Sequence, residues 1–432
     1  MFSMLYITAQ LQAFTVESTD GQAQSLKAQN LAMKDTFREK AVQCLLLARY
    51  TKGGPHILET LITMLTGESV LLKDSATDGW LLISTILHLA MRMGYHRDPG
   101  HFPEISPFEG EMRKRIWSAI LVLDLGLSLE MGLPRNATDT HIDTKEPGNL
   151  RDDDFDEGTT NMPAPRPETE WTPILPLMAR RRLISALGLI CDLNTDVNPP
   201  THDKVVKIDV LLEDIHNRAI PPVLRWKAMP HAITDSPSIL VQRIGLETAY
   251  YKSRILLYRR AVISDSIRRD QKSVQICLDS ALKILSFQQM LHDESQPYGR
   301  LCQLRWKVTH ILNQDVLLAT SMLCLYLQDV DKFELPATAG WTTCPPRADE
   351  VRQRLTMSHK IWLQRSTTSV EAGKVAKALS IVLGDTEAPA GHSIRASPYD
   401  PSTDIGAVPL HDFGTMFGDE CEKYLYARSY CL

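Results

Sequence analysis

Three aspartates with alternating spacing, Asp152, Asp154 and Asp156, have the residue type and pattern that begin a calcium-binding loop. Such a loop needs a glycine at its sharp turn and a bidentate glutamate at its end, where this sequence has Glu157 and Pro163. The spacing of a calcium site is therefore absent. We interpret these carboxylates as a solvated run of charge rather than as ligands.

Asp124 is the candidate for a buried carboxylate, because it follows Trp117 in an otherwise apolar run. An unpaired buried charge costs several kcal/mol, so Asp124 needs a partner. Arg113 lies on the same helical face but three turns away, roughly 16 Å at the helical rise, which excludes a direct pair. We expect a partner from another helix or backbone donors near Gly132. Because no second titratable group is placed beside Asp124, we interpret it as structural rather than catalytic.

Other motifs for catalysis or cofactor binding are missing from the sequence. It has no glycine-rich phosphate loop, no Gly-x-Ser-x-Gly turn and no His-Glu-x-x-His helix. His88 and His310 lie in apolar helical patterns, where a hydrogen-bonded core histidine is the ordinary case. We therefore assign no catalytic residue, cofactor or metal site and expect the protein not to be an enzyme, although a triad can assemble from distant residues.

The eight cysteines indicate a reduced protein without a local zinc cluster. Several, such as Cys277 and Cys324, lie in apolar helical patterns, which is typical of small buried hydrophobes in a reducing compartment. No Cys-x-x-Cys pair provides zinc-cluster spacing. The eight positions are 44, 191, 277, 302, 324, 344, 421 and 431.

Composition favours an intracellular protein that does not bind DNA directly. The 432 residues are 44% hydrophobic, which is ample for a core, and the net charge is -5. A pI near 6.2 argues against a surface that follows a phosphate backbone. The first residues lack the pattern of a signal peptide, and the most apolar run, from Trp80 to Met91, is too short for a membrane span.

Apolar side chains at helical spacing recur along most of the chain. Trp80, Ile83 and Leu87 begin one stripe that stops at Gly94, and Ser106-Pro107-Phe108-Glu109 has the residues of a capping box at the start of the next helix. We predict an all-α array of about ten or more helices. Its expected parts are a weakly structured segment 1–34, a helical domain 35–384 and an irregular tail 385–432.

The chain between residues 139 and 173 interrupts this pattern. It holds ten Asp or Glu against three Lys or Arg, with five prolines. A loop this long is uncommon unless it is functional or disordered. After it, Arg180-Arg181-Arg182 could serve nuclear import or phosphate contact, but we expect these three arginines to form the exposed face of an amphipathic helix.

The tail has the composition of an amphipathic activation segment. Residues 400–424 hold six acidic residues to one lysine, interleaved with Phe413, Met416 and Phe417. Carboxylates keep such apolar side chains solvated and available to a coactivator groove. An ordinary tail without this role is the alternative.

Three stretches resemble a known family. The first is Gly94-Tyr95-His96-Arg97-Asp98. The second runs from Glu111 to Pro134 and contains Arg113-Lys114-Arg115-Ile116-Trp117, followed by Asp124 and Ser128. Both are similar to the middle homology region of fungal binuclear zinc cluster transcription factors. Ser118, Leu125 and Leu133 depart from residues common there. Tyr250 to Arg260 resembles a second landmark, so the likeness covers about residues 40–384.

The resemblance implies a nuclear transcription regulator whose helical regulatory domain contacts coactivators or the transcription machinery. It further implies control of a metabolic or secondary-metabolite gene set, and it leaves room for a small-molecule effector and a homodimer. The N-terminal zinc cluster of the family is not found in this sequence. Two other interpretations stay open: a helical interaction scaffold, and an enzyme of secondary metabolism that uses the same fold.

Overall fold

The computed structural model describes residues 1–15, 21–71, 76–198, 200–227, 234–263, 271–304, 313–328, 348–366 and 370–384. In these ranges it has twelve α-helices and no strand, which confirms the predicted all-α array. The helices divide into two compact units, residues 1–250 with 303–311 and residues 251–302 with 312–432.

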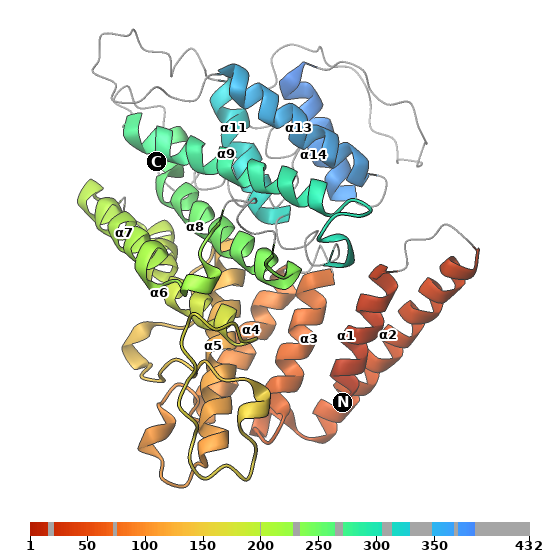
Figure 1. Cartoon of the computed structure of the whole chain (residues 1–432), viewed down its shortest axis with the longest axis vertical. Helices are drawn as coiled ribbons and strands as arrows, with labels where there is room; N and C mark the ends of the chain where they lie inside the picture. The colour runs from red at the N-terminus through yellow and green to blue at the C-terminus, as the bar shows by residue number, and fades with distance from the viewer. Residues whose placement is uncertain are drawn as a thin grey trace. The chain divides into compact units, whose positions relative to one another are not determined.

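The first unit is a series of helices in which α1 to α6 each pack against the next helix in the chain (Figure 1). A long loop after α5 separates two groups of them. The helices are α1 (Phe2–Thr15), α2 (Gly21–Leu47), α3 (Ile57–Leu71), α4 (Ala76–Arg92), α5 (Pro107–Met131), α6 (Leu175–Thr195), α7 (His202–Asp214) and the first half of α8 (Pro237–Ile263).

The N-terminal segment 1–34 differs from the weakly structured chain that we expected, because α1 and most of the first half of α2 occupy it. Helix α1 buries Tyr6, Ala9 and Ala13 and packs against α2 and α3. The Tyr6 ring fills the space beside Gly67, where a Cβ atom would approach it to 2.4 Å. Small buried residues and exposed apolar ones such as Met4 blur the periodicity of α1, which hid this helix in the sequence.

Two glycines and a serine set the end of α4 and both ends of α5, as predicted. Gly94 and Gly132 follow α4 and α5 with φ of 79° and 65°, a left-handed conformation that suits glycine. Ser106 caps α5 by accepting a hydrogen bond from the Glu109 backbone N–H at 3.1 Å. The predicted capping box is only half formed, because the Glu109 carboxylate accepts from Arg113 instead.

The second unit is built from α9 (Gln271–Glu294), α11 (Asn313–Gln328), α13 (Ala348–Ser366) and α14 (Val370–Leu383), which pack on one another, together with the second half of α8. A buried hydrogen bond of 2.7 Å from the Ser358 hydroxyl to the Gln288 side chain joins α13 to α9. Helix α8 continues past Arg260 to Ile263.

Several predicted features lie outside the described residues: the tail 385–432 with Phe413, Met416 and Phe417, the residue His310, and the cysteines at 344, 421 and 431. Within the described residues, no helix combines the length and the apolar character that crossing a membrane requires.

Candidate functional site

The connector from Gly94 to Asp98 is tied to the long loop by backbone contacts. The Tyr95 carbonyl accepts a buried hydrogen bond of 2.7 Å from the Thr144 hydroxyl. The Asp98 carboxylate accepts from the backbone N–H groups of Gly100 at 2.9 Å and Lys145 at 3.2 Å. Burial raises the pKa of Asp98, but these hydrogen bonds outweigh it, so the pKa is lowered. Asp98 therefore holds both its own turn and the loop.

Asp143 of the loop forms hydrogen bonds with the same connector. Its carboxylate accepts from the Asp98 backbone N–H at 2.8 Å and from Arg97 Nε at 3.2 Å, and His101 Nε2 lies 2.9 Å away. The Asp98 N–H, with His101 and Arg97, lowers the pKa of Asp143. Two segments that are about 45 residues apart in the sequence thus bind each other in space.

Glu111 and Arg115 of α5 anchor the next part of the loop. Glu111 is 4% exposed, and burial raises its pKa despite Lys114 and Arg115 nearby. It accepts from the Gly148 backbone N–H at 3.0 Å and from Arg115 Nε at 3.4 Å. Arg115 also donates to Asp152 at 2.6 Å and to the Leu150 carbonyl at 2.8 Å. Glu111 and Arg115 therefore position the loop.

Asp124 is buried, with 1% of its surface exposed, and is held by the chain just after α5. Its carboxylate accepts from the Asn136 side-chain amide at 2.7 Å and from the Ala137 backbone N–H at 2.9 Å. The predicted donors beyond Gly132 are therefore present. Arg113 is engaged elsewhere, by Glu109 at 2.8 Å.

Trp117 is fully buried and lies against His96 of the connector. The two ring centroids are 6.3 Å apart with the planes tilted by 57°. Trp117 Nε1 and His96 Nδ1 are both buried and lack a hydrogen-bond partner among the described residues. Trp117 therefore packs against the same connector whose Asp98 N–H donates to Asp143.

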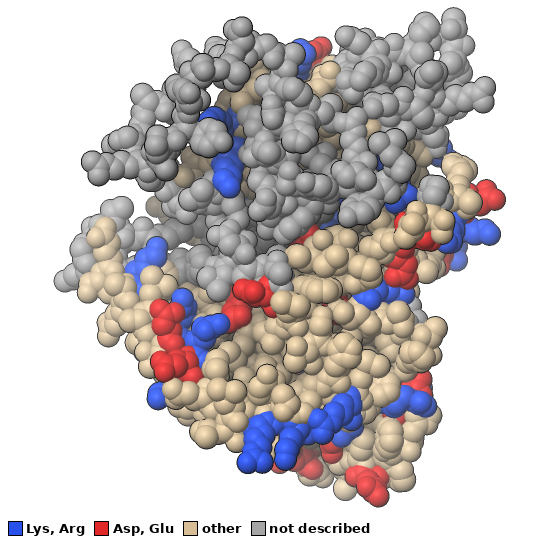
Figure 2. Space-filling model, turned by 180° about the vertical axis from the view of Figure 1, so that it is seen from behind, with Lys and Arg blue, Asp and Glu red and all other residues tan. Residues whose placement is uncertain are grey.

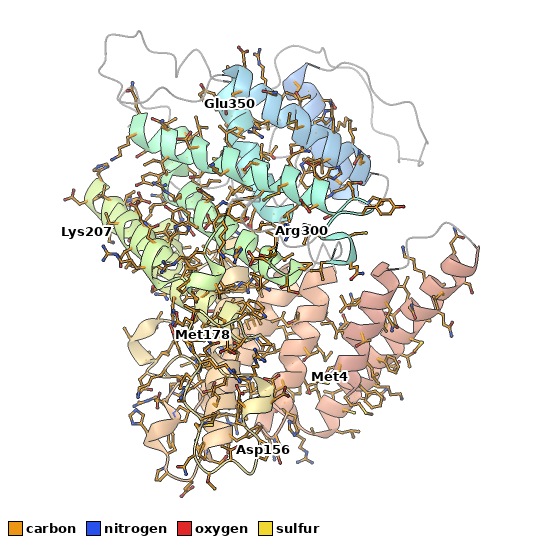
Figure 3. All side chains as sticks on the ribbon, viewed as in Figure 1. Met4, Asp156, Met178, Lys207, Arg300 and Glu350 are labelled. Atoms are coloured by element: carbon orange, nitrogen blue, oxygen red, sulfur yellow. The ribbon has the colours of Figure 1, made fainter. Side chains whose placement is uncertain are left out.

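The rest of the loop is partly paired, so our interpretation of it as a solvated charge run is wrong for Asp152 and Asp154, which form ion pairs with arginines. Arg166 donates to Asp154 at 2.5 and 3.0 Å and to Glu170 at 2.6 Å. The buried Asn149 donates toward the Glu170 carbonyl at 3.2 Å and accepts from Thr172. Asp156 at the lower end of the loop is exposed (Figure 3). Arginines and prolines within the loop thus make it an ordered part of the first unit.

The three arginines of α6 also differ from the exposed helix face that we expected. Arg182 donates to Glu168 at 2.6 and 2.9 Å and to Glu146 at 3.0 Å. Arg181 donates to the Thr144 carbonyl at 3.3 Å, and Arg180 to Gln242 at 2.8 Å. Burial lowers the pKa of Arg180. These contacts connect α6 to the loop and to α8, because the loop supplies carboxylates that the sequence alone did not place.

A histidine–carboxylate pair was not found from the sequence. His216 lies in a short π-helical turn (Ile215–Ala219), its Nε2 is 2.7 Å from the buried carboxylate of Glu247, and its ring stacks on Tyr250 at 3.9 Å. Such turns often occur at functional sites. Because the two residues are 31 positions apart, no local motif could reveal the pair.

Among the described residues, no three His, Cys, Asp or Glu side chains are grouped to hold a metal ion. Cys191, Cys277 and Cys324 are buried, whereas Cys44 and Cys302 are exposed. Burial raises the pKa of Cys191 to about 11 and that of Cys277 to about 12. The buried thiols are thus inert small hydrophobes at neutral pH.

A pocket of about 410 Å³ lies beside the connector. It is lined by Met93 and Gly94 at the end of α4, by residues 102–105 and by Arg113 of α5. Arg113 is oriented by its contacts with Glu109 and by stacking of its guanidinium over the Tyr95 ring at 4.9 Å. The connector, the loop and the pocket together form the candidate functional site.

The comparison with known proteins points to one class. The chain is 42% identical over 387 residues to the fusarisetin A cluster transcription factor of Fusarium sp. (strain FN080326), covering 88% of this chain and 51% of that protein. It is 41% identical over 396 residues to the equisetin cluster transcription factor of Fusarium heterosporum, covering 89% and 56% respectively. The chain thus spans about half the length of these relatives.

A Zn(2)-C6 fungal-type transcription factor of Monascus ruber is 38% identical over 354 residues, covering 80% of this chain and 43% of that protein. No solved structure matches the chain. The fungal specific transcription factor domain matches residues 3–193, a range that begins well before the residue 40 at which we placed the resemblance and that contains both α1 and the candidate site. Residues 3–193 of this chain therefore belong to the fungal specific transcription factor domain family.

Proposed function

We propose that this chain acts in a nuclear transcription regulator that controls a secondary-metabolite gene set. The observation that carries the proposal is its identity of about 40% to relatives named as cluster transcription factors. In this proposal, residues 35–384 form most of the regulatory domain, extended at its start by α1 and α2. The loop 139–173 braces this domain rather than moving, because six of its carboxylates are paired with arginines, namely those of Asp143, Glu146, Asp152, Asp154, Glu168 and Glu170.

We propose that the described residues regulate without contacting DNA themselves. The net charge of -5 supports this, because a DNA-binding surface usually has a basic excess. On the face drawn in Figure 2, acidic side chains lie close to most of the basic ones. The arginines of α6, which could have contacted phosphate, are engaged by Glu146, Glu168 and Gln242.

Gene deletion tests the regulatory role. In the source fungus, removal of the gene should change the transcripts of neighbouring biosynthetic genes together, and reintroduction should restore them. RNA sequencing of the three strains measures this. Unchanged transcripts under conditions that produce the metabolite would refute the proposal.

A reporter assay tests the proposed partner, a coactivator. Residues 384–432 fused to a heterologous DNA-binding domain should activate transcription, because carboxylates keep the aromatic side chains solvated and able to dock on an apolar groove. Replacing Phe413, Met416 and Phe417 together by alanine should remove activation. Replacing Ser402, Thr403 and Thr415 by alanine is the matched control and should leave activation intact.

A further inference from the structure

The pocket beside the connector has walls that are fixed before any ligand arrives. Asp98 and Asp143 hold the turn Pro99–His101, and the Phe102 and Ile105 backbone N–H groups close successive turns by donating to the carbonyls of Pro99 and Phe102 at 3.0 and 3.1 Å. A preformed pocket loses little entropy on binding. Its volume of about 410 Å³ lies within the range of roughly 300–1,000 Å³ that is typical of small-molecule sites.

Apolar side chains form much of the lining. Met93, Pro103 and Ile105 contribute to it, and Phe102 leaves 41% of its surface exposed although its backbone is fixed. Methionine adapts its shape to different ligands, and an aromatic ring offers a large contact area at low entropic cost. The pocket therefore suits a ligand with an apolar body.

The guanidinium of Arg113 supplies a directed polar contact. Its side chain is 18% exposed, and its plane is set by the Tyr95 ring. Of the five N–H donors of an arginine, three are used by the Glu109 carboxylate and the Met93 carbonyl. Two N–H bonds remain for an acceptor atom on a ligand.

The charges around the pocket disfavour an ionised ligand. Glu109 already neutralises Arg113, and the exposed Glu104 adds a second carboxylate to the wall. A ligand carboxylate would be repelled by these glutamates. A ligand ammonium could pair with Glu104, but the guanidinium repels it and it has no acceptor for the N–H groups of Arg113. An uncharged carbonyl oxygen accepts from Arg113 without either cost.

We propose that this pocket binds an uncharged small molecule that has an apolar body and a carbonyl oxygen accepting from Arg113. As a regulatory site, the pocket rests on the proposed transcriptional function, but binding itself is measured on the purified chain and does not depend on that function. Gly94 of the connector lines the pocket, and the same connector is joined to the loop through Asp98 and Asp143, so a bound ligand would also stabilise the contact with the loop.

Three probes with one body and different head groups test the proposal: 4-phenylbutanamide, 4-phenylbutanoate and 4-phenylbutylamine. Saturation-transfer NMR titrations on the purified full chain should show binding of the amide. The two charged probes should bind at least about fivefold more weakly, because the glutamates repel the carboxylate and the ammonium offers Arg113 no acceptor. Equal binding of the three probes, or no binding of the amide, would overturn the proposal.

Two variants of exposed residues locate the site without endangering the fold. Phe102→Ala should weaken amide binding about five- to tenfold by removing an aromatic wall. Glu104→Gln should strengthen binding of 4-phenylbutanoate while leaving the amide unchanged. Leu81→Ala is the matched control, since Leu81 is 55% exposed on α4 and about 18 Å along the helix from Met93. If Phe102→Ala bound the amide as the wild type and Leu81→Ala do, the pocket would not be the site.

Discussion

Replacing Asp124 by alanine should destabilise the first unit strongly, because the carboxylate is 1% exposed and accepts from two donors, Asn136 Nδ2 and the Ala137 N–H. A hydrogen bond to a charged group contributes about 1.5–3 kcal/mol, and a buried donor left unpaired costs its desolvation. Asn136 is only half-buried, so water can partly replace one contact. We therefore expect a loss of about 2–4 kcal/mol of unfolding free energy.

Urea denaturation followed by circular dichroism and by tryptophan fluorescence measures this loss, with both probes needed because the chain has two units. Asp153→Ala is the matched control, since Asp153 is exposed and such changes usually fall within about 0.5 kcal/mol. A double-mutant cycle with Asn136→Ala should give a coupling above about 0.5 kcal/mol. If Asp124→Ala were as stable as Asp153→Ala, the inference that these hydrogen bonds hold the chain after α5 would be refuted.

Four further predictions concern folding, pH, thiols and ligands. Trp117→Ala should cost about 3–5 kcal/mol in the same denaturation assay, as a buried ring is lost; wild-type stability with an altered activity would contradict a packing role. The pKa of Asp154 is lowered to about 2, mainly by hydrogen bonds from Arg166. A carboxylate whose pKa is lower in the folded protein stabilises the fold at pH values above its unfolded pKa, and this stabilisation is lost as the pH falls toward the folded pKa. The stability difference between wild type and Asp154→Asn should therefore be full above about pH 5 and vanish between about pH 4 and 2. Iodoacetamide mapped by mass spectrometry should label Cys44 and Cys302 in the native protein and Cys191, Cys277 and Cys324 only after unfolding; native labelling of Cys277 would contradict its burial. Elemental analysis and DNA retention assays on the purified chain should find no stoichiometric zinc and no duplex binding at physiological salt, and two zinc ions per chain would overturn this expectation.

The sequence alone determined the helices α4 and α5 of the first unit and the residues that end them. Ser106, Gly94 and Gly132 mark boundaries because capping and the left-handed conformation depend on the residue itself and its nearest neighbours. Apolar periodicity placed α4 for the same local reason. Asp124 could also be predicted to need a partner, because the cost of a buried charge does not depend on which partner supplies the hydrogen bond.

Only the tertiary structure decided which charges meet. Asp143 reaches Arg97 across 46 residues, and Arg182 reaches Glu146 across 36, so composition indicated solvated charge where the fold forms ion pairs. Helix α1 was likewise missed, since its burial depends on the space that Gly67 leaves for Tyr6. Helix ends follow from short-range geometry and could be predicted, whereas ion pairs and pockets depend on distant segments that only the packed helices bring together.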